Sequence, residues 1–133
     1  NCWFGRKKGV NFISISSIDE LTKLVKGVNI DNVQKYIVNN KNISLIIPNG
    51  TAVMNLKTKQ SERDIYRDPV HLSFHFGRFV ASLVVMKKLF NLDYTNLIYR
   101  PFSMMDINQK VCVAACDLAT LNPFEVTKIN VEE

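Results

Sequence analysis

A short, continuously apolar segment places the strongest constraint on how this chain can fold. Residues 43–48 read ISLIIP, a run rich in β-branched residues that stops at Pro48-Asn49-Gly50. A strand that is apolar on both faces is typical of a parallel sheet covered by helices on both sides. The run VNFISI (10–15) is the other clear strand candidate. The sequence therefore predicts an α/β fold in which only part of a sheet is visible.

Two helices are predicted between these strands. Ser17 and Glu20 have the spacing of a capping box for a helix through about Lys26, and Asp31 is placed to cap a second one. Residues 49–70 are polar and without clear periodicity, so we expect a long irregular connection there. Connections of that length in compact domains are more often functional than idle.

Two more helices are predicted in the second half of the chain. Apolar residues recur at helical spacing from about His71 to Phe90, and we expect this stripe to pack on the sheet through residues such as Phe79, Val80 and Leu83. The final helix is expected to begin at Asp106, with Gln109 completing a capping box, and to end before Pro123.

Composition limits the class of protein. A chain of 133 residues with 47% hydrophobic residues fits one folded domain, residues 1–133. The net charge of +5 comes from scattered Lys and Arg residues, so we expect a solvated surface rather than a nucleic-acid partner. No run of about 18 apolar residues occurs, so the sequence predicts no membrane-spanning helix. Cys112 and Cys116 are four residues apart, which favours two small buried side chains over a disulfide or a metal site.

The segment RDPVHLSFHFGR (67–78) holds both histidines of the chain. Asp68 precedes His71 by three residues, a spacing that lets a carboxylate accept a hydrogen bond from one imidazole nitrogen while the other nitrogen takes a proton from a nucleophile. We therefore expect the Asp68 carboxylate to lie about 2.6–3.2 Å from a ring nitrogen of His71. An aspartate that caps a helix beside a histidine would look the same in sequence.

A metal site is the other chemistry that this segment allows. His71 and His75 lie one helical turn apart if they are helical, and Asp68 would be the third ligand. The glutamate that follows the first histidine in zincins is replaced by Leu72, so the zincin pattern is incomplete. We therefore expect neither a metal ion nor a cofactor.

Residues 43–126 resemble the C-terminal block of the SGNH (GDSL) hydrolase superfamily, in an uncharacterised Bacteroidetes-type branch. The resemblance rests on a strand ending in P-x-G-T-A-x-x-N, a loop with R-D-G-x-H-L-S and a helix that opens with G-R-(Y/F)-x-A. The tail agrees through Tyr-Arg-Pro (99–101) and Asn-Pro-Phe (122–124). The matching positions are Pro48, Gly50, Thr51, Ala52, Asn55, Arg67, Asp68, His71, Leu72, Ser73, Gly77, Arg78, Phe79 and Ala81.

The resemblance implies a flavodoxin-like, three-layer α/β/α sandwich with a parallel sheet. It implies that Asp68 orients and polarises His71, and that His71 is the general base of a catalytic triad. Substrates in such families are small esters or O-acylated carbohydrates, and no cofactor is involved. Pro69 stands where the family usually has glycine.

The nucleophile of that family is not visible here. No Gly-Asp-Ser, Gly-Asn-Ser or G-x-N motif occurs, and Ser14 and Ser16 follow a strand without the preceding glycine. We therefore expect the C-terminal part of a longer hydrolase domain, with an incomplete sheet through which chains would associate. Two alternatives stay open: a non-catalytic interaction or structural domain with a relic Asp-His pair, and a small metal-binding protein.

Overall fold

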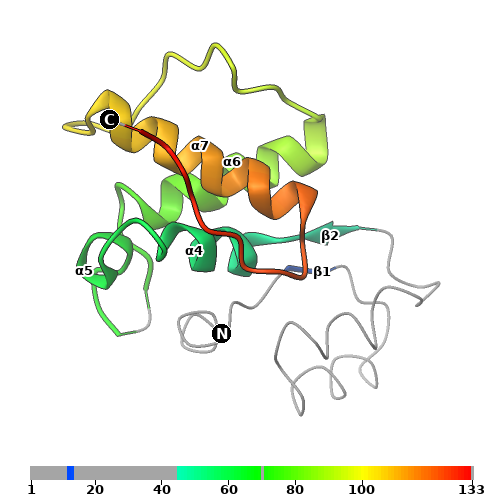
Figure 1. Ribbon diagram of the computed structural model, residues 1–133, viewed down its shortest axis with the longest axis horizontal. Helices are drawn as coiled ribbons and strands as arrows, with labels where there is room; N and C mark the ends of the chain where they lie inside the picture. The colour runs from blue at the N-terminus through cyan, green and yellow to red at the C-terminus, as the bar shows by residue number, and fades with distance from the viewer. Residues whose placement is uncertain (1–11, 14–44, 70, 133) are drawn as a thin grey trace.

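The computed structural model of the protein describes residues 12–13, 45–69 and 71–132. Its elements are β1 (Phe12–Ile13), β2 (Ile46–Ile47), α4 (Asn49–Leu56), α5 (Glu62–Ile65), α6 (Gly77–Phe90) and α7 (Asp106–Leu121). Figure 1 shows α4, α6 and α7 packed side by side, with the two short strands beyond one end of α4. The described part is therefore mixed helix with little strand, which agrees with an α/β fold only in the general sense.

The two strands correct the predicted sheet. β1 and β2 pair antiparallel, with Phe12 opposite Ile47 and Ile13 opposite Ile46, so the parallel pairing predicted for them is wrong. Ile46 and Ile47 are half-buried, and α6 packs against β2. An apolar run indicates that both faces of a strand are covered, but it says nothing about the direction of its neighbour. The two helices predicted between the strands, together with Ser14 and Ser16, lie outside the described residues.

The irregular connection predicted over residues 49–70 is also wrong in large part, because α4 and α5 occupy much of it. Pro48 directly precedes the first turn of α4, where a missing backbone N–H is tolerated. Ala52, Val53 and Leu56 are buried and form its apolar face. The Asn-Gly pair suggested a turn, but tertiary burial of these side chains outweighs that local signal.

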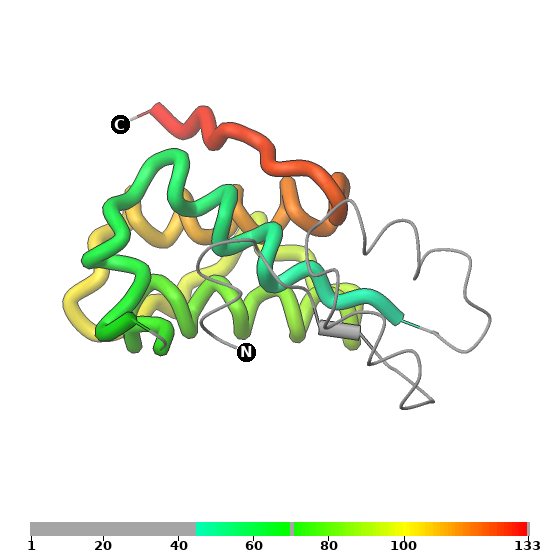
Figure 2. The backbone as a smooth tube through the Cα atoms, turned by 90° about the horizontal axis from the view of Figure 1, so that it is seen from below, coloured from blue at the N-terminus to red at the C-terminus, as the bar shows by residue number. Residues whose placement is uncertain are grey.

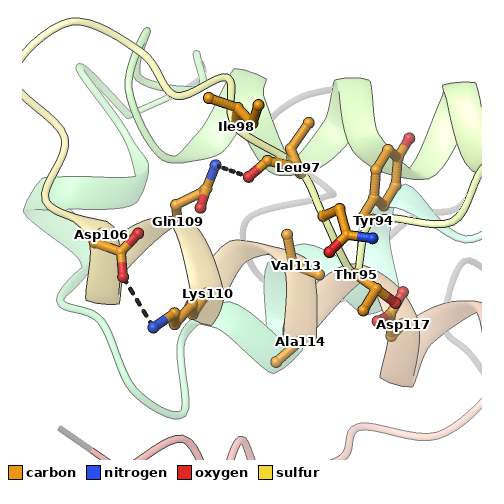
Figure 3. A pocket seen from close by; sticks show the side chains of 11 residues that line it. Tyr94, Thr95, Leu97, Ile98, Asp106, Gln109, Lys110, Val113, Ala114 and Asp117 are labelled. Atoms are coloured by element: carbon orange, nitrogen blue, oxygen red, sulfur yellow. Dashed lines mark hydrogen bonds and ion pairs between the residues drawn. The ribbon is translucent and has the colours of Figure 1, made fainter.

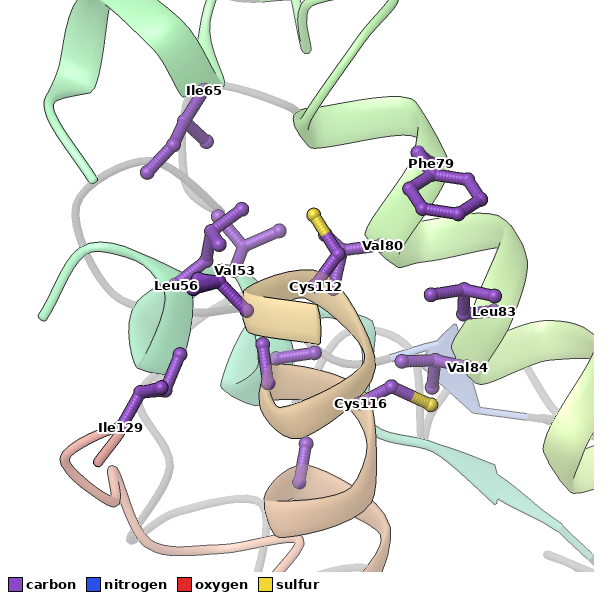
Figure 4. Packing of buried hydrophobic residues seen from close by; sticks show 14 of the residues in the cluster. Val53, Leu56, Ile65, Phe79, Val80, Leu83, Val84, Cys112, Cys116 and Ile129 are labelled. Carbon is purple, nitrogen blue, oxygen red and sulfur yellow. The ribbon is translucent and has the colours of Figure 1, made fainter. Parts of the chain in front are cut away.

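The core lies where the three longer helices meet (Figure 4). The most extensive packing joins α4 to α7, followed by α6 to α7 and α4 to α6. As the sequence predicts, Phe79, Val80 and Leu83 are buried, but within the described residues they belong to a core made mainly by helices. Helix-on-helix packing of apolar stripes therefore organises this part of the molecule.

Small side chains on α7 allow the helices to approach closely. Cys112, Ala115 and Cys116 are fully buried, which confirms the prediction of two small buried thiols. Burial raises the pKa of the Cys112 thiol to about 12. Burial, with a contribution from the Asp117 carboxylate, also raises the pKa of the Cys116 thiol to about 12.

One ion pair closes the edge of the contact between α6 and α7. Lys87 Nζ lies 2.5 Å from Asp117 Oδ1. Partial burial acts to lower the pKa of Lys87, but the hydrogen bond and charge of Asp117 outweigh it, and the pKa is raised. The pair is partly exposed, so it aligns the helices more than it stabilises them.

A polar stripe on α4 holds the C-terminal segment. Thr51 donates its hydroxyl to the carbonyl of Pro123 (2.6 Å), Asn55 Oδ1 accepts the N–H of Thr127 (2.7 Å), and Thr58 Oγ1 accepts the N–H of Ile129 (3.1 Å). Thr51, Asn55 and Thr58 are spaced i, i+4 and i+7, so their side chains share one helical face. Residues 122–132 accordingly run along α4 in the same direction, as Figure 2 shows.

The ends of α6 and α7 confirm some sequence predictions and correct others. α6 begins at Gly77 instead of His71, and it ends at Phe90, where Asn91 adopts a left-handed conformation (φ 53°) that asparagine tolerates. α7 ends before Pro123 as expected. Its predicted capping box is wrong, because Asp106 is already helical and Met105 is the capping residue. No helix among the described residues is long and apolar enough to cross a membrane.

We predict that Asn55→Ala lowers the free energy of unfolding by about 1–3 kcal/mol, because it removes the partner of the Thr127 amide at a buried position. Hydrogen exchange at the Thr127 amide should become faster. Lys59→Ala, an exposed change one turn later, is the matched control and should leave both quantities unchanged. Unaltered exchange at Thr127 in Asn55→Ala would show that the stripe does not hold the segment.

We predict that stability falls at alkaline pH because of the two thiols. Their folded-state pKa values of about 12 exceed the reference value of 9.0. The stabilisation is therefore complete below pH 9 and is lost as the pH rises toward 12, by at most about 1.4 kcal/mol per pH unit and thiol. Denaturant unfolding across this range should give a steeper decline for the natural protein than for Cys112→Ala/Cys116→Ala. Equal slopes would contradict the assignment.

Candidate functional site

Asp68 and His71 lie in a tight loop between α5 and α6. The backbone N–H of Arg67 donates to the carbonyl of His71 (3.1 Å), and Tyr66 and Leu72 form an isolated antiparallel bridge. These contacts join the two ends of the loop, and Asp68 lies in the turn between them, beside His71. In Figure 1 this loop follows α5, at the opposite end of α4 from β2. Asp68 and His71, called the dyad below, therefore do not lie directly at the end of β2.

The Asp68 side chain holds His71 in two ways. Both carboxylate oxygens lie 2.9 Å from Nδ1 of His71, and Oδ1 also accepts the backbone N–H of His71 (2.8 Å). The expected contact between the two residues is confirmed. Pro69, which is exposed, is compatible with this geometry although glycine is usual there in the resembled family.

The contact determines which nitrogen of His71 carries the proton. An ionised carboxylate only accepts hydrogen bonds, so Nδ1 must be the donor. In the neutral ring Nε2 is then the basic nitrogen, and none of the described residues forms a hydrogen bond with it. The side chains of His71 and Asp68 are 50% and 39% exposed, so the pair faces solvent. This arrangement can accept a proton at Nε2 while Asp68 stabilises the resulting imidazolium.

Ser73 anchors the loop to the start of α6. Its hydroxyl donates to the carbonyl of Asp64 (2.5 Å) and accepts the N–H groups of Phe76 (3.3 Å) and Gly77 (3.1 Å). Its backbone N–H donates to the carbonyl of Ile65 (2.8 Å). Ser73 therefore ends the loop and caps the first turn of α6, and this explains why the helix begins after the two histidines.

Gly77 allows the loop and the helix to touch. A Cβ at this position would lie 2.3 Å from the carbonyl oxygen of Ile65 and 2.8 Å from Cβ of Leu72. Any larger residue would therefore push the loop away from α6. The spacing S-x-x-x-G (73–77) is the sequence signal for this anchor, and both residues are also positions at which the chain matches the resembled family.

The metal alternative finds no support in the described residues. His71 and His75 both precede α6, so they are not related by a helical turn. No group of three His, Cys, Asp or Glu side chains in the described part of the chain is arranged to hold a metal ion. His75 instead lines a cavity together with Arg67 and Phe74.

One cavity, shown in Figure 3, is lined by residues other than Asp68 and His71. It has a volume of about 590 Å³ and lies between residues 94–98 and α7. Gln109 Nε2 donates to the carbonyls of Leu97 (2.9 Å) and Tyr99 (2.6 Å), and Lys110 pairs with Asp106 (2.9 Å). The side chain of Gln109 thus holds a loop instead of capping α7. The wall of this cavity includes neither Asp68 nor His71, so the cavity is not a candidate for the chemistry of His71.

A second cavity of about 360 Å³ lies beside the dyad loop. Its walls include Arg67, which directly precedes Asp68, and Phe74 and His75, which follow His71. Arg67 Nε lies 3.6 Å from Asp68 Oδ2, so one side chain connects the cavity to the dyad. The described structure is thus a mixed α/β domain with a solvent-facing Asp-His pair at the edge of a cavity.

The comparisons with known proteins give the family. Residues 14–119 match a family described as a domain of unknown function, DUF4886, and the chain belongs to that family. The structure is similar to the crystal structure of a DUF4886 family protein from Bacteroides uniformis ATCC 8492, with 32% sequence identity and a TM-score of 0.66. The match covers 75% of this chain and 38% of that one, so this chain spans well under half of its relative's length. No curated protein matches the sequence.

We predict that Gly77→Ala destabilises the protein by about 1–3 kcal/mol, because its Cβ would overlap the Ile65 carbonyl. The intrinsic helix preference for alanine, up to about 1 kcal/mol, acts in the opposite direction. Chemical denaturation measures the effect, and NMR shifts of residues 66–72 should move with it. Ser82→Ala, an exposed change in the same helix, is the control. A variant as stable as the natural protein would show that the close contact is unimportant.

Proposed function

We propose that this protein is part of an SGNH-type serine esterase or acyl hydrolase, in which Asp68 and His71 are the acid and base of the catalytic triad. The observation that carries the proposal is the double contact of both Asp68 oxygens with Nδ1 of His71 at 2.9 Å. The resemblance of residues 43–126 to that superfamily supports it. Under this proposal the described helices and strands belong to a larger three-layer α/β/α sandwich.

His71 would move one proton in each half of the reaction. Nε2 takes the proton of a serine hydroxyl as the serine oxygen bonds to the ester carbonyl carbon. When the ester C–O bond breaks, the same proton passes to the leaving alcohol, and an acyl-enzyme remains. Water then attacks the acyl carbon while Nε2 takes one of its protons. That proton passes to the serine oxygen as the acyl–serine bond breaks, which releases the acid and restores the serine hydroxyl. Asp68 stays ionised throughout and stabilises the imidazolium.

Under this proposal the nucleophile and the oxyanion donors lie outside the described residues. Ser73 is buried and its hydroxyl is already engaged by Asp64, Phe76 and Gly77. The relative from Bacteroides uniformis extends well beyond the part that this chain matches, which leaves room for such groups in a protein of this family. Ester bonds, including those of O-acylated carbohydrates, are the proposed substrate class, and the chemistry requires no cofactor.

The proposal predicts hydrolysis of a short-chain aryl ester that depends on the dyad. In the protein expressed from its complete gene, His71→Ala should lower kcat by about 10²–10⁴-fold, because the general base is lost. Asp68→Asn should also lower kcat strongly, because an amide no longer selects the Nδ1-protonated ring. Labelling with a fluorophosphonate, followed by mass spectrometry, should identify the serine nucleophile.

Lys88→Ala is the control, because Lys88 is exposed on α6 and belongs neither to the Asp68–His71 pair nor to the wall of the cavity beside it. It should retain most of the aryl esterase activity. Hydrolysis that His71→Ala leaves unchanged would remove His71 from the mechanism. A protein that neither hydrolyses the ester nor reacts with the fluorophosphonate would favour the non-catalytic interaction domain.

A further inference from the structure

The cavity of about 360 Å³ beside the dyad loop has the size of a small-molecule site. Three segments line it: α5 with the residues just after it, residues 73–76, and residues 102–108. The side chains used below are Arg63, Arg67, Phe74, His75, Phe102 and Asn108. None of these side chains belongs to the dyad, although Arg67 contacts Asp68.

Arginine side chains give this cavity an excess of positive charge. Arg63 and Arg67 are part of its wall, and the guanidinium carbon of Arg67 lies 5.3 Å from the centroid of the Phe74 ring. Arg63 forms no ion pair within the described part of the chain, and the one acidic residue in the wall, Asp64, accepts a hydrogen bond from the Ser61 hydroxyl (2.7 Å). Arg67 already contacts the Asp68 carboxylate (3.6 Å), so Arg63 is the arginine that an anionic group in this cavity would find without an acidic partner among the described residues.

The rim of the cavity is aromatic and exposed. Phe74 is 59% exposed and Phe102 is 89% exposed, so neither ring contributes much to the core. Asn108 Oδ1 accepts a hydrogen bond from Gln60 (3.3 Å), which leaves its NH₂ group as a donor at the cavity wall. Exposed apolar rings beside arginines and amide donors match a ligand with both an apolar face and polar edges.

The backbone beside Phe102 is strained. Ser103 adopts φ 66° in a turn closed by the N–H of Met104 and the carbonyl of Pro101 (3.0 Å). Glycine or asparagine would occupy this turn position with less strain. Strained positions of this kind cluster at ligand sites, where the surrounding structure holds them in place.

We propose that this cavity binds a carboxylate-bearing sugar ring, that is, a uronate residue of an O-acylated saccharide. The arginines would bind the carboxylate, the exposed phenylalanines would cover the apolar face of the ring, and Asn108 and His75 would bind hydroxyl groups. The assignment of this sugar as the substrate rests on the proposed function. Arg67 adjoins Asp68, so an ester on the same saccharide would lie near His71.

The test compares methyl glucuronide with methyl glucoside, which differ only by the carboxylate. NMR titration should show that the natural protein binds the glucuronide at least about tenfold more tightly, because charge-assisted hydrogen bonds are added. Arg63→Gln should remove most of this preference, and Phe102→Ala should weaken the binding of both sugars. Arg100→Gln and Phe90→Ala, exposed changes of the same types elsewhere, are the matched controls.

The binding measurement and the esterase measurement separate the two proposals. Equal affinity for both sugars, or a preference that survives Arg63→Gln, overturns the uronate site even if the protein hydrolyses esters. Selective binding of the glucuronide without hydrolysis of the acetylated sugars supports the uronate site and contradicts the proposed esterase activity. A higher kcat/KM for acetylated glucuronide than for acetylated glucoside, lost in Arg63→Gln, supports both.

Discussion

The close approach of two backbone segments at Gly77 is the constraint on which the whole candidate site depends. The Ile65 carbonyl occupies the space where any other residue would place its Cβ. Ser73 locks this contact by bonding to Asp64 on one side and to the first turn of α6 on the other. The loop that carries Asp68 and His71 is therefore clamped at both ends to helices. A dyad on an unclamped loop would lose the alignment that catalysis requires.

The helices behind this clamp are held by two kinds of contact. Apolar side chains of α4, α6 and α7 form the core, while Thr51, Asn55 and Thr58 bind the C-terminal segment. The matched positions Thr51 and Asn55 of the P-x-G-T-A-x-x-N motif are thus explained by structure, without a role in catalysis. Asn55 satisfies a backbone N–H that would otherwise be left without a partner, and so it secures the end of the described chain.

The dyad and the cavity beside it are connected by one side chain, that of Arg67. His71 faces solvent with its basic nitrogen available, and Arg67 links Asp68 to a cavity lined by arginine and phenylalanine. The chain belongs to the DUF4886 family and spans 38% of the relative from Bacteroides uniformis. The esterase assignment and the uronate ligand are proposals built on this arrangement, and they stand on separate measurements.

The sequence by itself determined the local features whose signals lie close together in the chain. The spacing of Asp68 and His71 predicted their contact, the apolar periodicity predicted the end of α6 at Phe90, and Pro123 marked the end of α7. The Cys112-Cys116 pair predicted buried thiols. Tertiary structure decided the rest. Burial against α7 made a helix of residues 49–56 in spite of the Asn-Gly signal, and the apolar run at 43–48 could not specify the direction of β1. The cavity could not be predicted either, because Arg63, Phe74 and Phe102 are brought together only by the way α5, the loop and α7 pack.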